Sequence, residues 1–490
     1  MKGLRVKIQT FQFDKLRTFL ILISLFITLV MTTKNAHAQS SDTSAFDKTL
    51  ENAFSTTTLP GYSLALVKDG ELVEVRAGGK ISLAGDTPIT PETPMQIGSV
   101  SKSFAALAIM QLVEAGKLEL DAPIENYLPE FTDKAAGSIT LRQAMSHTSG
   151  LSTLQGNQTQ TDLSMDSEAL ARRVTDLSNV TPELQPGQAF MYSNANYQIV
   201  GRIIEVVSGT SYADYVQSKI LMPLTMTDSY VIGGNEKSSS ALGHLPWFGS
   251  QEPIEGLLMG AGSSPQGGVV TTAADLSKYA IVMMNQKDDI ISAQNKRLMM
   301  SPVSEAVSHY GLGWSIYPPL GLVWHNGSNP GFQAQLSMNP ETQDAFVFIA
   351  NGGNSYGFNE ISAVGFNLTL EAMQLEGPKG GGGILSKAVF VLATLLPFVL
   401  IFIALRNWQQ REKMAQHSSL RRWLVTLTYV LIAALSCWAL FVSIPFMFGI
   451  PLDALQLFVP DWSLILHAIV FTSIVLAMVR IGLMIGVKRT

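Results

Sequence analysis

The apolar and polar positions divide the chain into a short apolar leader, a long segment of mixed polarity and an apolar C-terminal part. Near the start of the mixed segment, Tyr62 to Val67 and Glu71 to Ala77 flank the turn residues Lys68-Asp69-Gly70, which predicts a β-hairpin. Near its end, a second meander is predicted by four further β-rich runs: Gly313 to Tyr317, Leu322 to Trp324, Gln333 to Met338 and Ala345 to Ile349.

Between these strand-rich ends, apolar residues recur at three- and four-residue spacing, which predicts helices. The helices expected in this way are Ser99 to Ala115, Ser167 to Leu177, Tyr197 to Val207 and Tyr212 to Ile220. We therefore predict an α/β protein of the α+β type, in which both ends of the domain build one antiparallel sheet and helices pack against it.

The C-terminal part contains three apolar runs, at residues 388–405, 424–448 and 463–479. Each is long enough to cross a hydrocarbon core of about 30 Å at about 1.5 Å per residue. Residues 376–387, which include Gly380 to Gly383, have the composition of a flexible linker. We expect a membrane domain over residues 388–490, with three transmembrane helices in contact with the lipid bilayer.

The N-terminus carries five basic residues, then the apolar stretch Phe19 to Met31, then Ala36-His37-Ala38. This order is typical of a signal peptide, residues 1–38, that is cleaved after Ala38, and an uncleaved signal anchor is the alternative. Either version exports the domain of mixed polarity, residues 39–375.

The charges between the apolar runs predict the same orientation. The loop between the first two runs holds five Lys or Arg residues, whereas the loop before the third holds Asp453 and Asp461 and no Lys or Arg. Because basic loops stay in the cytoplasm, the domain before the linker is expected on the extracytoplasmic face, periplasmic or extracellular.

Composition excludes several classes of function. Charged residues make up 14% of the chain, hydrophobic residues 47%, and the net charge is -5, without a basic block of the kind that binds nucleic acid. The single cysteine, Cys437, cannot form an intrachain disulfide, and the seven histidines show no metal-ligand spacing. We expect no cofactor and no metal.

The segment from Ile97 to Phe104 opens a predicted helix and places Ser99 and Lys102 three residues apart, on one helical face. A serine is a weak nucleophile until a neighbouring group takes its proton, which a lysine partly desolvated by apolar neighbours can do. The pair suits acyl transfer, although a Ser-x-x-Lys spacing alone also arises as a helix start with a surface lysine.

Two later segments add specificity, namely Tyr192-Ser193-Asn194 and His325-Asn326-Gly327-Ser328. In this order, the three segments resemble the motif triplet of the serine β-lactamase and penicillin-binding-protein superfamily, in the branch of class C β-lactamases, DD-peptidases and esterases. Three accessory stretches resemble the same family: Leu141 to Leu151, Tyr197 to Tyr212 and Gly267 to Asp275. The resemblance covers nearly all of residues 39–375 and implies a β-lactamase/transpeptidase-like fold.

The resemblance also implies roles. Ser99 would attack the carbonyl carbon, while Lys102 and Tyr192 would move protons, the tyrosine as general base or relay. Asn194 would hold the lysine and contact a substrate amide. The backbone N–H groups of Ser99 and Ser328 would form an oxyanion hole, in which each donor can be worth about 3 to 4 kcal/mol to the transition state.

Three glycines and two histidines complete the set of candidate site residues. Gly327 is expected to leave room for substrate along its strand, and Gly267 with Gly268 to shape the wall of the site. His325 stands where class C β-lactamases usually have a lysine, which favours the carboxylate of a β-lactam. The histidine therefore favours peptide or ester substrates over β-lactams. The alternative is a strand histidine without contact to substrate. His147 resembles a structural turn residue of the family.

The function expected is an outward-facing, membrane-anchored serine hydrolase acting on peptides, amides or esters, including small or cell-wall-derived substrates. Three alternatives remain open. The first is a penicillin-binding sensor or scaffold that is acylated without turnover, the second a true class C-like β-lactamase. The third treats the membrane part as a transporter, for which His467 and Arg480 are the main ionisable residues within the spans.

Overall fold

The computed structural model describes residues 44–234, 240–354, 356, 360–380 and 384–486. The predicted signal peptide, residues 1–38, lies outside this set. The chain divides into two compact units, residues 1–56 and 57–490, so the predicted hydrolase segment from Thr57 onward and the C-terminal helices belong to one unit. The first unit contributes α2 (Ala45–Thr57).

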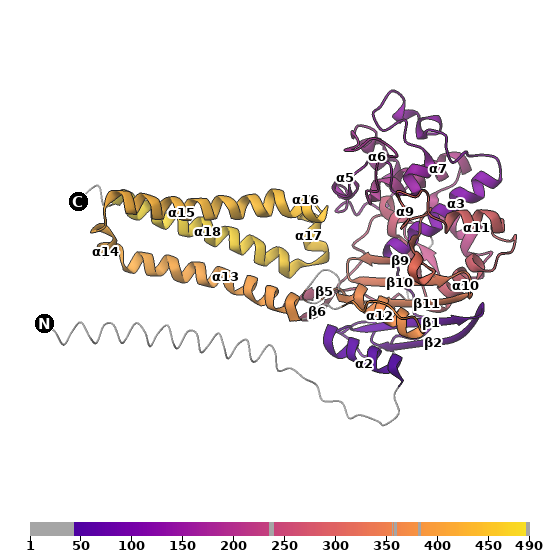
Figure 1. Ribbon diagram of the computed structural model, residues 1–490, viewed down its shortest axis with the longest axis horizontal. Coiled ribbons are helices and arrows are strands. Elements are labelled where there is room, and N and C mark those ends of the chain that lie inside the picture. Colours follow the sequence, from indigo (N-terminus) through magenta and orange to yellow (C-terminus); the bar gives the residue numbers. More distant parts are fainter. Residues whose placement is uncertain (1–43, 235–239, 355, 357–359, 381–383, 487–490) are drawn as a thin grey trace. The chain divides into compact units, whose positions relative to one another are not determined.

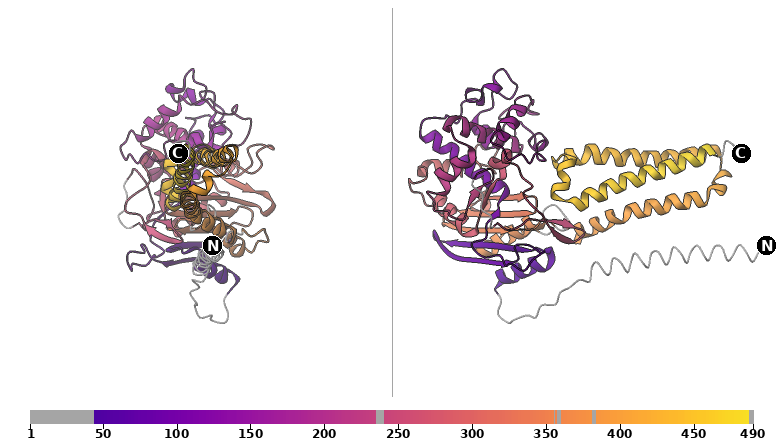
Figure 2. Two further views of the ribbon diagram at one scale, coloured as in Figure 1. Left: turned by 90° about the vertical axis from the view of Figure 1, so that its left-hand side faces the viewer. Right: turned by 180° about the vertical axis from the view of Figure 1, so that it is seen from behind.

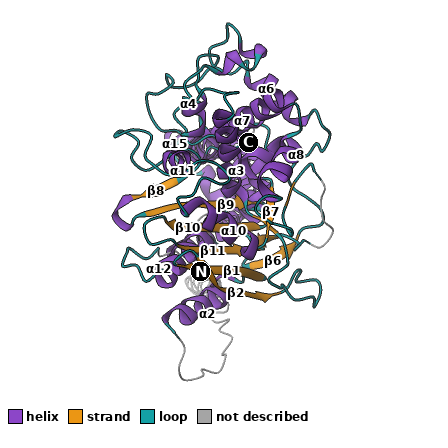
Figure 3. Cartoon of the chain, turned by 90° about the vertical axis from the view of Figure 1, so that its right-hand side faces the viewer, coloured by secondary structure: helices purple, strands orange, loops and turns teal. Residues whose placement is uncertain are grey.

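A six-stranded antiparallel sheet confirms the prediction that both ends of the domain build one sheet. The strand order is β2 (Glu71–Gly79), β1 (Gly61–Lys68), β11 (Asp344–Ala350), β10 (Phe332–Asn339), β9 (Leu322–Asn329) and β8 (Ser315–Tyr317), and Figure 3 shows these strands stacked in this order. Lys68 pairs with Glu71 across the predicted hairpin. Asp69 and Gly70 between them both have positive φ, as a tight two-residue hairpin turn requires.

The two faces of the sheet carry alternate residues of each strand. On one face, Ala334, Leu336 and Met338 join the main hydrophobic core, against which α10 (Ala273–Met284) packs. On the other face, α12 (Glu360–Ala372) covers the odd positions of β10, and Ser337 Oγ lies 3.1 Å from Thr369 Oγ1. The central strands β10 and β11 are therefore buried on both faces, whereas the edge strand β2 is partly exposed.

The helical region is built around α3 (Ser101–Glu114), whose first ten residues are all buried. Because apolar residues surround it on every side, this helix has no polar face to present to water. The other helices of the region are α4 (Leu141–Met145), α5 (Thr153–Asn157), α6 (Ala169–Leu177), α7 (Asn194–Ser208), α8 (Tyr212–Val216), α9 (Ser264–Gly267) and α11 (Ala293–Met299).

Two small sheets complete the domain. One has the order β3 (Met95–Gln96), β7 (Val269–Thr271) and β4 (Tyr230–Val231). The other pairs β5 (His244–Trp247) with β6 (Ser250–Pro253). The helical region, the six-stranded antiparallel sheet and the two small sheets confirm the predicted α+β class.

Three long C-terminal helices contain the three predicted spans. They are α13 (Ile384–Gln409), a run from α15 (Ser419–Trp438) through a π-helical turn into α16 (Ile444–Phe448), and α18 (Pro460–Gly486). By length and composition all three can cross a membrane. They lie side by side in Figures 1 and 2, with the short helices α14 (Arg411–Ala415) and α17 (Leu452–Phe458) in the connections.

Candidate active site

The serine of the first motif lies at the entrance to the buried helix. Ser99 is part of a short 3-10 turn, Gly98–Val100, that leads into α3, and Lys102 follows in the first turn of α3. Lys102 Nζ donates to Ser99 Oγ at 2.9 Å and to the carbonyl oxygen of Gln266 at 3.0 Å. The predicted pair is thus in direct contact, and Gln266, which the sequence analysis did not single out, supplies the second acceptor.

Lys102 has no carboxylate partner in the described part of the chain. Its side chain is fully buried, and Nζ lies 4.9 Å from the ring centre of Tyr192 and 5.5 Å from that of Tyr197. Burial lowers the pKa of the Lys102 ammonium well below its usual value, because the charged form loses hydration without gaining a counter-charge. A buried lysine of this kind is shifted toward the neutral amine, which can accept a proton.

Tyr192 lies in the loop before α7, and its ring lies against that of His147, with ring centres 4.1 Å apart and the ring planes tilted by 37°. Burial raises the pKa of the Tyr192 phenol, and a hydrogen bond with the Ser99 side chain lowers it only in part. The phenol therefore keeps its proton at neutral pH. A protonated phenol can pass a proton on, and the choice between relay and general base stays a prediction for Tyr192.

Asn194 opens α7 and lines the same pocket as Ser99. Its side-chain Nδ2 donates to Asn157 Oδ1 at 2.7 Å, and its Oδ1 is buried without a hydrogen-bond partner. Both hydrogen bonds of Lys102 go elsewhere, so the lysine is held by the Gln266 carbonyl rather than by Asn194. The free Oδ1 is an acceptor that a substrate N–H can use.

Strand β9 brings the third motif against the serine. The outer neighbour β8 pairs only with Leu322 to Trp324, so the rest of that edge is open to the turn that carries Ser99. At this contact two glycines meet: a Cβ on Gly98 would lie 2.5 Å from Ser328 N, and a Cβ on Gly327 would lie 1.8 Å from Ile97 O. Gly98 also has a φ of +50°, which favours glycine.

The structure shows a packing reason for a glycine at position 327. A side chain there would strike the backbone of Ile97 and would approach Ser99 N to 2.9 Å. That Gly327 also leaves room for a substrate along the strand stays a prediction. The two glycines therefore allow the backbone nitrogens of Ser99 and Ser328 to approach one another, as an oxyanion hole requires. The Ser328 hydroxyl itself accepts from Gln333 Nε2 at 2.8 Å.

His325 has both ring nitrogens engaged by the protein. Since a carbonyl can only accept, Nδ1 donates to Asn326 O, and Nε2 accepts from the Tyr310 hydroxyl at 3.0 Å. Burial is the main reason that the pKa of the His325 imidazole falls to about 3. His325 is therefore neutral and is not among the residues that line the pocket, which favours the strand-histidine alternative over contact with substrate.

His147 fits the structural turn expected of it. It has a φ of +57°, and its Nδ1 accepts from the backbone N–H of Ser193 at 3.1 Å. Its backbone oxygen accepts from Met191 N at 2.7 Å. These contacts on both sides of Tyr192 position the loop that carries the phenol.

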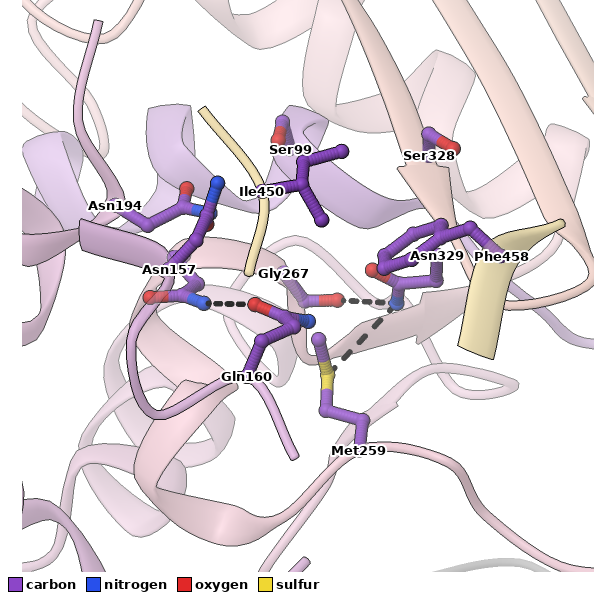
Figure 4. A pocket seen from close by; sticks show the side chains of 11 residues that line it. Ser99, Asn157, Gln160, Asn194, Met259, Gly267, Ser328, Asn329, Ile450 and Phe458 are labelled. Carbon is purple, nitrogen blue, oxygen red and sulfur yellow. Dashed lines mark hydrogen bonds between the residues drawn. The ribbon is translucent and has the colours of Figure 1, made fainter. Parts of the chain in front are cut away.

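A pocket lies beside Ser99 (Figure 4), with about 440 Å³ of empty space when the open solvent at its mouth is included. Its lining combines Ser99, Ser328 and Gly267 with five neutral amide side chains and three apolar ones, namely Asn157, Gln160, Asn194, Gln266, Asn329, Met259, Ile450 and Phe458. The expected position of Gly267 on the site wall agrees with this lining. Most of the others were missed, because isolated Asn, Gln and apolar residues carry no sequence signal of a site.

The described residues contain no group of three or more His, Cys, Asp or Glu side chains placed to hold a metal ion. The reactive groups at the pocket are the Ser99 hydroxyl, the buried Lys102 amine and the Tyr192 phenol. A nucleophile beside a desolvated amine, with backbone donors close by, is an arrangement for acyl transfer.

Comparison with known proteins places this site in a family. The model of the Beta-lactamase family matches residues 46–363. Protein flp of Staphylococcus aureus (strain N315) is 26% identical over 387 residues, which cover 75% of each chain. Penicillin-binding protein 4 of Amycolatopsis lactamdurans is 29% identical over 321 residues, which cover 61% of this chain and 83% of that protein.

Solved structures show the same fold. The octameric penicillin-binding protein homologue from Pyrococcus abyssi superposes with a TM-score of 0.57 at 25% identity, covering 68% of this chain and 77% of that one. The D-amino acid amidase from Ochrobactrum anthropi SV3, complexed with L-phenylalanine, has a TM-score of 0.55 at 24% identity, covering 67% and 97%. These likenesses confirm the expected β-lactamase/transpeptidase-like fold.

The contact between Gly98 and Gly327 generates a testable prediction. Gly327→Ala should slow acylation of Ser99 by a fluorescent penicillin about 100-fold or more, the cost of losing one oxyanion donor, because the new methyl group pushes β9 away from Ser99. It should also lower the unfolding temperature. Ser328→Ala keeps the backbone N–H and should stay within about threefold of the wild-type rate. Wild-type acylation and stability in Gly327→Ala would contradict this account of the glycine.

Proposed function

The chain belongs to the Beta-lactamase family, and from that premise we propose that it is a membrane-anchored serine hydrolase acting through an acyl-enzyme on Ser99. Its substrates are amides, peptides or esters, and its catalytic domain faces the extracytoplasmic side. The observation that carries the proposal is the 2.9 Å hydrogen bond between Ser99 Oγ and the fully buried Lys102 Nζ. Family membership makes the protein a serine hydrolase; the residue roles below are our proposal.

Acylation begins with attack of Ser99 Oγ on the substrate carbonyl carbon. The hydroxyl proton passes to the neutral Lys102 amine, whose pKa burial has lowered, and the negative oxygen is stabilised by the backbone N–H groups of Ser99 and Ser328. As the carbon–nitrogen or carbon–oxygen bond breaks, the departing group receives a proton from Tyr192, which Lys102 reprotonates. Water then attacks the ester, its proton returns through the same groups, and Ser99 is released.

The electrostatics of the site support amide or ester substrates. Class C β-lactamases are expected to use a lysine at the position of His325 to favour a carboxylate. Here His325 is buried and its pKa of about 3 leaves it uncharged. No charged side chain lines the pocket of the described chain, so a free carboxylate would find no counter-charge there.

The anchoring and the orientation rest on the C-terminal helices and on the loop charges. Three helices are apolar enough to span a bilayer, and the five basic residues between the first two favour a cytoplasmic position for that loop. The proposal keeps the domain boundaries expected from the sequence, 39–375 for the hydrolase and 388–490 for the membrane domain; the helix α13 begins at Ile384.

One observation favours a second candidate, a sensor that is acylated without turnover. Asn157, which lines the pocket, donates to the carbonyl oxygen of Gly449 in the connection between the second and third long helices. A shift of Asn157 on acylation of Ser99 would therefore be transmitted to the membrane helices through this hydrogen bond. Stable stoichiometric labelling without product release would favour this candidate over the hydrolase.

The proposal predicts that the full-length protein in detergent or nanodiscs hydrolyses p-nitrophenyl acetate and that Ser99→Ala loses this turnover entirely. Ser103→Ala provides a matched control, because Ser103 Oγ donates to the Val100 carbonyl within α3 and does not line the pocket. Retention of turnover by Ser99→Ala would remove Ser99 as the nucleophile.

The pH dependence of acylation tests the role of Lys102. A base must be unprotonated, so the acylation rate should rise with pH through the lowered pKa of Lys102 and reach its plateau well below the usual lysine value near pH 10.4. Lys102→Met should reduce the rate by about 100-fold or more and abolish this rise. A wild-type rate that keeps climbing with a midpoint near pH 10.4 would mean that Lys102 stays charged at neutral pH.

A further inference from the structure

The connection between the second and third long helices forms part of the active-site wall. Ile450, just after α16, and Phe458, the last residue of α17, line the same pocket as Ser99. Figure 4 shows both residues on ribbon of the C-terminal colour, among pocket residues that come from much earlier in the chain. The pocket is therefore built from two parts of the chain, residues 99–329 and residues 450–458, that lie about 120 residues apart in the sequence.

Four contacts of the described chain hold this connection in place. Asn157 Nδ2 donates to Gly449 O at 2.8 Å, and Thr161 Oγ1 donates to Asp453 Oδ2 at 3.2 Å. Phe248 N donates to Asp461 Oδ2 at 3.0 Å, where α18 begins.

The fourth contact is steric. A Cβ on Gly449 would lie 2.6 Å from the Thr153 side chain, so only a glycine allows this close approach. Gly449 also has a φ of +62° and ends α16 in the left-handed conformation. The connection is thus held at its start by Gly449, in its middle by Asp453 and at its end by Asp461.

The pocket is lined by two chemically different kinds of side chain. Neutral amides surround Ser99, and among them Asn194 Oδ1 is a buried acceptor without a partner, suited to an N–H next to the scissile carbonyl. The other lining side chains are apolar, namely Ile450, Phe458 and Met259. A ligand that satisfies both is uncharged, carries a hydrogen-bonding amide or ester, and bears an apolar substituent.

We propose that Ile450 and Phe458 are specificity-determining residues that select uncharged substrates with an apolar substituent on the acyl side. The inference rests on the proposed hydrolase function and deepens it, since it names the substrate class of the same site. It also gives the membrane domain a role besides anchoring: the hydrolase pocket is incomplete without the connection between the second and third long helices.

Substrate preference gives the first test. Full-length protein in nanodiscs is assayed on p-nitrophenyl acetate and p-nitrophenyl hexanoate, which differ only in the apolar acyl chain. The ratio of kcat/KM, hexanoate over acetate, should fall about tenfold in the double variant Ile450→Ala/Phe458→Ala, because methylene groups lose their contacts. The control Phe446→Ala, an exposed side chain of α16 outside the pocket, should keep the wild-type ratio.

Cysteine protection gives a test that needs no turnover. In a Cys437→Ser background, Ile450→Cys should react with a small maleimide several-fold more slowly once Ser99 carries a bulky penicillin adduct, whereas Phe446→Cys should react equally with and without it. An unchanged ester ratio together with unprotected Ile450→Cys would overturn the inference. Absence of both turnover and acylation in the wild type would instead overturn the proposed function on which it rests.

Discussion

Two glycines, Gly98 and Gly327, set the geometry on which the site depends. They allow the turn before α3 and the open edge of β9 to approach within a distance that no side chain would permit. Gly98 precedes the nucleophile and Gly327 precedes Ser328, so one close contact brings together the two backbone N–H groups proposed for the oxyanion hole. The sheet supports it, because β8 ends early and leaves this stretch of β9 exposed to the helical region.

The second constraint is a buried amine without a counter-charge. Lys102 is surrounded by the rings of Tyr192 and Tyr197 and by the carbonyl of Gln266, which holds its position but does not neutralise it. Burial then favours the neutral lysine, the protonated Tyr192 phenol and the neutral His325 together. The same desolvation thus favours the neutral form of all three groups. The neutral Lys102 amine is the base that we propose for the activation of Ser99.

Periodicity sufficed for much of the fold. Alternating and helical patterns predicted the hairpin of β1 and β2, the late meander and the three apolar helices, because burial there follows regular spacing. The motif residues Ser99, Lys102, Tyr192 and Asn194 were predictable through resemblance to a family. Asn157, Gln160, Ile450 and Phe458 were not, because only tertiary contacts bring them to Ser99. The packing of Gly327 against Ile97 and the hydrogen bond from Lys102 to the Gln266 carbonyl were also not predictable, because each joins residues that are far apart in the sequence.

The most direct test of the account is the position of the acyl group. Full-length protein is incubated with the uncharged ester p-nitrophenyl hexanoate, quenched in acid, digested and mapped by mass spectrometry, beside Ser99→Ala treated in the same way. The account predicts one adduct, on the peptide that contains Ser99, and none in Ser99→Ala. An adduct on another residue, or an equal adduct in both proteins, would contradict it.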